Sequence, residues 1–169
     1  MSAISTSPIQ LELAADLLQR GERMSLRVRG SSMLPSLFPG DLLTFRRCAP
    51  GEIVVGDIVL FMREGRCFIH RVAERLAVGG DSRIRTRGDA LPACDAPVGE
   101  TEVLGRLSVV ERKGWRLPPP RLGPVRTLVA GLVQRSALAA RALVAAHERF
   151  WPEAETIVSR REGLSRRAL

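Results

Sequence analysis

The sequence predicts a mainly β protein: a compact β body with an N-terminal helix and a C-terminal basic amphipathic helix. Short apolar runs recur between Met24 and Arg112, and Gly-Asp or Pro-Gly pairs separate them, which is typical of an antiparallel β body. Segments with helical spacing lie before and after this region, and three consecutive prolines, 118–120, mark a boundary. A chain of 169 residues is long enough for one domain with an appendage.

The N-terminal helix is expected over residues 8–20. Ser7 supplies a capping hydroxyl, Pro8 suits the first helical position, and Gly21 ends the helix. The predicted organisation is an N-terminal amphipathic helix at 1–22, a β domain at 23–114, a proline-rich linker at 115–124 and a basic helical tail at 125–169.

Six strands follow from alternation or from short apolar runs. Pro39-Gly40-Asp41 and Gly56-Asp57 are expected to be structural turns, and Glu64-Gly65-Arg66 is expected to close a hairpin. The predicted strands are residues 25–29, 42–45, 58–61, 67–72, 83–87 and 102–111.

The tail carries most of the positive charge. Residues 1–112 contain 15 Arg against 14 acidic residues, whereas residues 113–169 contain 11 Lys and Arg against 4 Glu. We expect one long helix here, with an apolar stripe and basic side chains around it. Such a helix suits a membrane interface, and equally suits packing on the β body or on a second copy. The stripe comprises Val125, Leu128, Val129, Leu132, Leu143 and Val144, and the basic residues are Arg126, Arg135, Arg141 and Arg149.

No secretory signal peptide is apparent in the sequence, and no run of 18 apolar residues occurs. The nearest candidate span, Leu128 to Ala146, contains two arginines. Three cysteines at 48, 67 and 94 form no CxxC pair and are interpreted as buried or free thiols of a reducing compartment. We therefore expect a cytoplasmic or peripherally membrane-associated protein.

The segment Gly30-Ser31-Ser32-Met33-Leu34-Pro35 offers a nucleophile, and the histidine of Ile69-His70-Arg71-Val72 offers a base. Ser32 follows a predicted strand and a glycine that permits close approach of a substrate backbone. A serine hydroxyl needs a nearby base to become a useful nucleophile. Bases near neutral pH are scarce here, because the chain has only two histidines and one lysine.

Several ordered motifs resemble those of the type I signal peptidase family, a group of S24/S26-like serine peptidases. That family shares its catalytic fold with the self-cleaving phage and SOS repressors. The resemblance spans roughly residues 28–107. The motifs are the 30–35 segment, Pro39-Gly40-Asp41, Gly56-Asp57-Ile58-Val59, His70-Arg71-Val72, Arg87-Gly88-Asp89 with Asp95, and Val103-Leu104-Gly105-Arg106.

The resemblance implies Ser32 as nucleophile and His70 as general base, as in the histidine-base branch of archaea and the endoplasmic reticulum. It implies Asp95 as the residue that orients the imidazole and Asp89 as a second functional aspartate. Both aspartates also suit turns, so which one faces His70 stays open, with Asp95 favoured. Lys113 lies beyond all the motifs and does not align with the lysine that most bacterial members use.

The oxyanion donors would be the backbone N–H of Ser32 and of a neighbour. The family's side-chain donor position falls on Gly30, which has no hydroxyl, while Ser31 and Met33 flank the nucleophile and Met33 is expected to pack beneath it. The resemblance implies neither a metal nor a cofactor.

The leading hypothesis is a serine endopeptidase of signal-peptidase type that cuts a leader or precursor peptide with small side chains before the cut. The helix at residues 8–20 is too short for the family's membrane anchor, so a dedicated peptide substrate is expected. The alternatives are an idle or self-processing module of the same fold and a protein whose basic tail binds a membrane or nucleic acid. No Ala-Gly or Cys-Gly pair precedes the domain, and nucleic acid is the least expected partner.

Overall fold

A computed structural model describes residues 23–78 and 81–151. The predicted N-terminal helix and the basic end at 152–169 lie outside the described residues. The elements, in chain order, are β1 (Arg23–Arg27), β2 (Leu42–Arg46), β3 (Ile58–Arg63), β4 (Arg66–Val78), β5 (Asp81–Arg87), β6 (Val98–Gly99), the 3-10 helix Glu100–Glu102, β7 (Val103–Arg112), β8 (Trp115–Leu117), α2 (Pro124–Arg135) and α3 (Ala137–Phe150). The prediction of a mainly β protein is confirmed.

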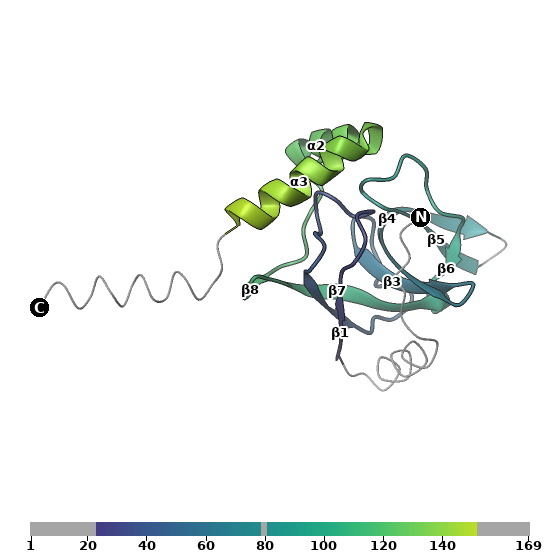
Figure 1. The fold of residues 1–169 in the computed structure, drawn as a ribbon. Coiled ribbons are helices and arrows are strands. Elements are labelled where there is room, and N and C mark those ends of the chain that lie inside the picture. The colour runs from purple at the N-terminus through teal and green to yellow at the C-terminus, as the bar shows by residue number, and fades with distance from the viewer. Residues whose placement is uncertain (1–22, 79–80, 152–169) are drawn as a thin grey trace, which may run out of the picture.

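The eight described strands form one antiparallel sheet in the order β1-β2-β7-β3-β4-β5-β6, with β8 paired to β7 (Figure 1). All six predicted strands form, and five differ from the prediction by one or two residues at an end, whereas β4 extends from the predicted end at residue 72 to Val78. Two-residue β6 and three-residue β8 were not predicted, because strands this short show no periodicity.

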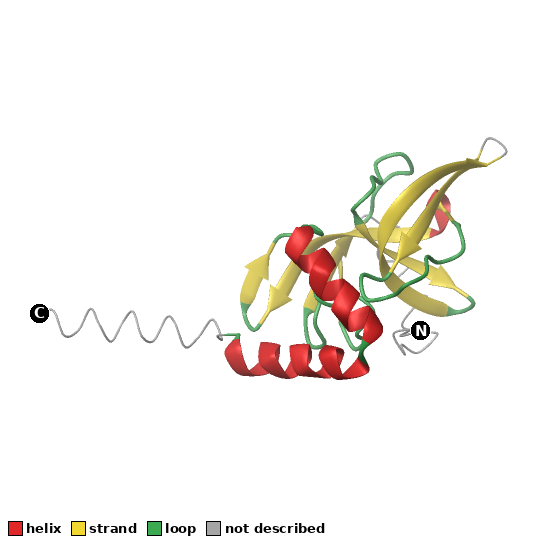
Figure 2. Cartoon of the chain, turned by 90° about the horizontal axis from the view of Figure 1, so that it is seen from above, coloured by secondary structure: helices red, strands yellow, loops and turns green. Residues whose placement is uncertain are grey.

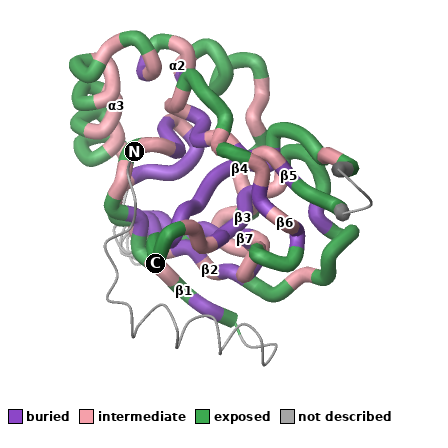
Figure 3. The backbone as a smooth tube through the Cα atoms, turned by 90° about the vertical axis from the view of Figure 1, so that its right-hand side faces the viewer, coloured by how far each residue is buried: buried purple, intermediate pink, exposed green. Residues whose placement is uncertain are grey.

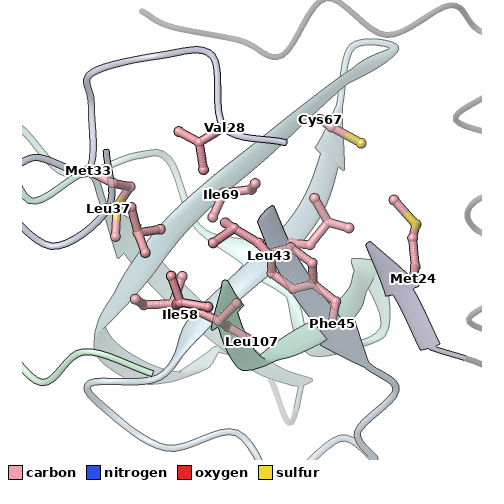
Figure 4. Packing of buried hydrophobic residues seen from close by; sticks show 12 residues of the cluster. Met24, Val28, Met33, Leu37, Leu43, Phe45, Ile58, Cys67, Ile69 and Leu107 are labelled. Carbon is pink, nitrogen blue, oxygen red and sulfur yellow. The ribbon is translucent and has the colours of Figure 1, made fainter. Parts of the chain in front are cut away.

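Each face of the sheet packs against its own apolar cluster, since successive side chains of a strand point to opposite faces. Ile58, Leu60 and Ile69 belong to the larger cluster (Figure 4). Their neighbours Val59 and Phe61 belong to the second cluster, which extends to β5 and β6. Buried segments therefore concentrate along the strands, whereas the two helices are mostly exposed or half-buried (Figure 3).

The predicted turns are built as expected. Arg63 pairs with Arg66, and Glu64 and Gly65 both have positive φ, 50° and 68°, the conformation of a two-residue hairpin turn. At the turn before β2, Asp41 accepts a hydrogen bond from the Phe38 N–H at 2.8 Å.

The tail forms two helices, so the expectation of one long helix was wrong. Ser136, with extended φ and ψ of −146° and 116°, separates α2 from α3, and its hydroxyl accepts a hydrogen bond from the Ala139 N–H at 3.2 Å. The helices lie across one side of the β body at an angle to each other (Figures 1 and 2). Neither described helix is long and apolar enough to cross a bilayer.

Candidate active site

Ser32 lies in a tight turn between β1 and β2, residues 31–37, here called the serine turn. The N–H of Leu34 donates to the carbonyl of Ser31 at 3.2 Å, and the N–H of Leu37 donates to the carbonyl of Met33 at 3.0 Å. Met33 and Leu37 pack into the larger cluster of the β body, as Figure 4 shows. Leu34 points the other way and packs with Val133 of α2. The β body and the helices therefore hold the turn from two sides.

The turn that follows β5 approaches the Ser32 backbone closely. The Ala90 N–H donates to the Ser32 carbonyl at 2.8 Å. A Cβ at Gly88 would lie 2.7 Å from the same carbonyl oxygen, closer than nonbonded atoms can pack, so only glycine fits there. Within the described residues, the N–H groups of Ser32 and Met33 donate no hydrogen bond. They remain available to an incoming acceptor.

His70 projects from β4, and its Nδ1 lies 2.7 Å from Asp95 Oδ2. The hydroxyl of Thr86, on neighbouring β5, donates to the same Oδ2 at 2.6 Å, and the Asp95 N–H donates to the Thr86 carbonyl at 2.8 Å. The His70 side chain is 4% exposed and that of Asp95 is 20% exposed. Asp95 is thus fixed from both its backbone and its carboxylate.

The contact with Asp95 determines the role of the other ring nitrogen. Burial alone would raise the pKa of Asp95, but hydrogen bonds from His70 and Thr86 and the nearby charges hold it below its ordinary value of 3.8. An ionised Asp95 accepts the proton of Nδ1, which leaves Nε2 of a neutral imidazole as an acceptor.

The His70 Nε2 has no hydrogen-bond partner among residues 23–78 and 81–151, and the Ser32 hydroxyl donates to none of these residues. The direct Ser32–His70 contact expected of a dyad is therefore not formed in this structure.

Asp89 has a different partner from Asp95. Its two carboxylate oxygens accept hydrogen bonds from Nε and Nη2 of Arg71 at 2.9 and 2.8 Å. Arg71 also donates to the Ser36 hydroxyl in the serine turn at 3.2 Å and to the carbonyls of Gly56 and Pro120 at 2.9 Å each. Asp89 therefore anchors a buried cation that joins four segments, and it does not contact His70.

Of the two predicted aspartates, Asp95 contacts the imidazole of His70 and Asp89 contacts Arg71, and their functional roles stay predictions. The supporting roles of Arg71 and Thr86 were missed. An arginine beside His70 in an apolar strand was a usable signal, because a buried guanidinium requires an acidic partner. Thr86 carries no such signal, since a threonine in an alternating strand is ordinary.

The two other candidate bases, Lys113 and His147, contact groups elsewhere in the fold. Lys113 Nζ donates to the carbonyls of Glu148 and Trp151 at 2.7 and 3.1 Å, at the end of α3. His147 stacks on Phe38 with ring centroids 3.8 Å apart. All three cysteines are free, and burial raises the pKa of Cys67 to about 11.

One family model matches the chain. It describes the peptidase S24-like proteins and covers residues 1–108, which include the serine turn, His70 and both aspartates. A search of curated proteins found no match. Because the family model spans more than half of the 169 residues, the chain belongs to the peptidase S24-like family.

Proposed function

We propose that the protein is a serine endopeptidase of signal-peptidase type, with Ser32 as nucleophile, His70 as general base and Asp95 as the orienting acid. The observation that carries this proposal is the 2.7 Å contact between His70 Nδ1 and Asp95. It leaves Nε2 without a hydrogen-bond partner among the described residues, so this nitrogen is the proposed proton acceptor. The histidine distinguishes this site from the lysine-base members of the resembled family.

In the proposed mechanism, the Ser32 hydroxyl attacks the carbonyl carbon of a peptide bond while its proton passes to His70 Nε2. Ionised Asp95 stabilises the imidazolium that forms. The unengaged N–H groups of Ser32 and Met33 are the proposed donors to the oxyanion. His70 then protonates the leaving amine, and a water molecule hydrolyses the acyl-enzyme with His70 again acting as base.

We infer a leader or precursor peptide as the substrate. This inference rests on the resemblance to the signal peptidase family, whose substrates are extended segments with small residues before the cut. The serine turn follows β1, which lies at one end of the sheet formed by the described strands, and an extended peptide can pair with such an edge.

Covalent labelling and cleavage test the proposal together. Wild type, Ser32→Ala, His70→Ala and the control Ser25→Ala are treated with a fluorophosphonate probe, which phosphonylates an activated serine with loss of fluoride. Labelling is located by mass spectrometry, and candidate leader peptides are then assayed for cleavage. We expect labelling at residue 32 in wild type and Ser25→Ala, and no cleavage by the other two variants.

The alternatives give different results in the same experiment. An idle module of this fold leaves Ser32 unlabelled and every peptide intact, which would overturn the proposal. A self-processing module shortens its own chain in a Ser32-dependent manner but cuts no added peptide. Cleavage that survives in Ser32→Ala would also overturn the assignment.

We also propose a peripheral contact with anionic lipid through the outward face of α2. Val125, Leu128 and Leu132 are 76%, 70% and 56% exposed, and Arg126 and Arg135 lie exposed on the same helix. Apolar side chains flanked by arginines suit a membrane interface. Sedimentation with vesicles of phosphatidylglycerol tests this contact, with Leu128→Glu expected to weaken it. Equal binding of variant and wild type would overturn it, as would equal binding to neutral phosphatidylcholine vesicles.

A further inference from the structure

We propose that the cavity between the serine turn and the helices α2 and α3 binds an aliphatic segment of the peptide substrate. This inference rests on the proposed peptidase function and adds a recognition site to it. The cavity volume is about 660 Å³, and Ser31 and Ser32 form part of its wall. A peptide that enters it lies against the proposed nucleophile.

The wall opposite the serine turn comes from the helices. Val133 of α2 and Ala140 and Val144 of α3 line the cavity, and Leu91 of the turn after β5 completes its apolar surface. Leucine-sized side chains gain free energy when they leave water for such an apolar surface. The chemistry of the wall therefore favours aliphatic side chains.

The charged residues of the cavity, Arg141 and Glu148, lie exposed on α3. They are two helical turns apart, with Val144 and Ala145 between them. Residues Ala137 to Glu148 all lie on α3 and span about 16 Å along its axis. An extended peptide rises about 3.3 Å per residue, so roughly five residues fit alongside this helix. The apolar selection is expected within that distance of the cut bond.

The helical wall is attached to the active-site turns. The side-chain amide of Gln134 in α2 donates to the carbonyls of Asp89 and Leu91 at 3.1 and 3.3 Å. Leu34 of the serine turn packs against the helices. A peptide held by α3 is therefore held at a defined position relative to Ser32. Both helices lie beyond residue 108, where the family match ends, so this recognition site belongs to the part of the chain outside that match.

The test separates recognition from chemistry. Two fluorescein-labelled hexapeptides are compared by anisotropy: Ala-Leu-Leu-Ala-Leu-Ala and its counterpart with three serines in place of the leucines. Binding is measured on the full-length Ser32→Ala protein, which avoids turnover. We expect at least tenfold tighter binding of the leucine peptide.

Cavity variants identify where that peptide binds. Ala137→Trp and Ala145→Trp place an indole at two exposed positions that line the cavity. The matched control, Ala146→Trp, lies on the same helix and is exposed, but it does not line the cavity. We expect both cavity variants to lose the preference for leucine and the control to keep it, with all melting temperatures unchanged.

Two results would overturn the inference: equal binding of the two peptides, or equal loss in Ala145→Trp and Ala146→Trp. Fluorophosphonate labelling of Ser32 in the same variants, without the Ser32→Ala change, reports the chemistry separately. If Ser32 is labelled but the leucine peptide is not preferred, the proposed cavity recognition is contradicted and the proposed peptidase function is not. Peptide preference with unlabelled Ser32 contradicts the proposed peptidase and leaves a peptide-binding cavity.

Discussion

The β body and the helices α2 and α3 use opposite means to hold their side chains. In the body, buried polar residues fix one another: Asp89 binds Arg71, and Thr86 binds Asp95. In the helices, α3 has no buried residue and α2 buries only Ala130 and Val133. Side chains of the body are therefore restricted by several partners each, whereas the helices present most of their surface to solvent. The β body and the two helices therefore differ in how many partners hold each side chain.

Within the β body, Asp95 and Asp89 also differ in their exposure and in the partner that each one contacts. Asp95 is partly exposed and contacts the imidazole, while Asp89 is fully enclosed and contacts a guanidinium. The first arrangement suits a proton-transfer site, and the second suits a structural anchor. Variants of the two residues should consequently fail in different measurements.

The largest effect is expected for Asp95→Asn. An amide at this position stabilises the wrong imidazole tautomer and no longer stabilises the imidazolium, so kcat should fall by roughly 10³–10⁴-fold. The melting temperature should change little, because the amide has nearly the same size. Steady-state cleavage kinetics check the expected fall in kcat, and thermal unfolding of the same preparation checks the melting temperature. A loss in kcat of less than tenfold would contradict the role given to Asp95.

Asp89→Asn should act mainly on stability. It leaves the buried Arg71 without its charged partner, and removing one member of a buried ion pair costs about 3–5 kcal/mol. Urea unfolding measures this loss of unfolding free energy. Asp95→Asn is the control. The proposed roles require its main loss to be in kcat, whereas the main loss in Asp89→Asn should be in unfolding free energy. Unchanged stability in Asp89→Asn would contradict the anchor role.

The Gly88→Ala substitution probes the junction between the β5 turn and the serine turn. Its Cβ would meet the Ser32 carbonyl at 2.7 Å, and relieving this overlap should cost about 1–3 kcal/mol and displace Ser32, the proposed nucleophile. Gly123→Ala is the matched control, because nothing lies within 4 Å of its Cβ. Equal stability and equal kcat in the two variants would show that the turns tolerate displacement.

Much of the fold could be predicted because strands and turns leave local signals. The Glu64-Gly65 hairpin and the runs at 58–61 and 67–72 are readable from alternation and turn residues alone. The break at Ser136 was missed, since the apolar stripe continues past it and a serine inside a helical pattern is a weak stop signal. The packing of Leu34 on α2 was not foreseen, because contacts between distant segments depend on tertiary geometry.

The site was predicted to a similar degree. The resemblance selected His70 and favoured Asp95 over Asp89 as its partner, but both aspartates also suited turns, so the sequence left the choice open. That distinction depends on the path of the turn after β5, which brings Asp95 back to Thr86. The cavity beside Ser32 was not predicted either, because its walls come from segments more than 90 residues apart in sequence.

The smallest effect is expected at His147, where α3 meets Phe38, the residue that follows the serine turn. Its ring stacks on Phe38 at 3.8 Å and lies 5.3 Å from the Trp151 ring. The Arg112 guanidinium lies over both Phe38 and Trp151, 4.7 and 5.0 Å from their centroids. The end of α3 is thus joined to the β body through a histidine next to a cation.

Burial lowers the pKa of His147 below its ordinary value of 6.5, and the charges of Arg112 and Lys113 add to this, while Asp41 and Glu148 oppose it. A lowered pKa means that the folded state binds the proton less readily than the unfolded state. The contact should therefore be fully stabilising above about pH 6.5 and weaken as pH falls toward the lowered pKa.

The expected loss is about half a kcal/mol, because solvent screens this partly exposed group. Unfolding free energies measured between pH 7.5 and pH 5 for wild type and His147→Phe test it. The phenylalanine keeps the stacking and removes the titrating nitrogen, so its stability should fall less steeply with acidification. If the unfolding free energies of the two proteins fall equally with acidification, protonation of His147 does not affect the attachment of the helices. The Asp95–His70 pair of the β body is the same in the two proteins. If the unfolding free energy of wild type falls more steeply with acidification, the difference therefore comes from protonation of His147 at the α3 contact.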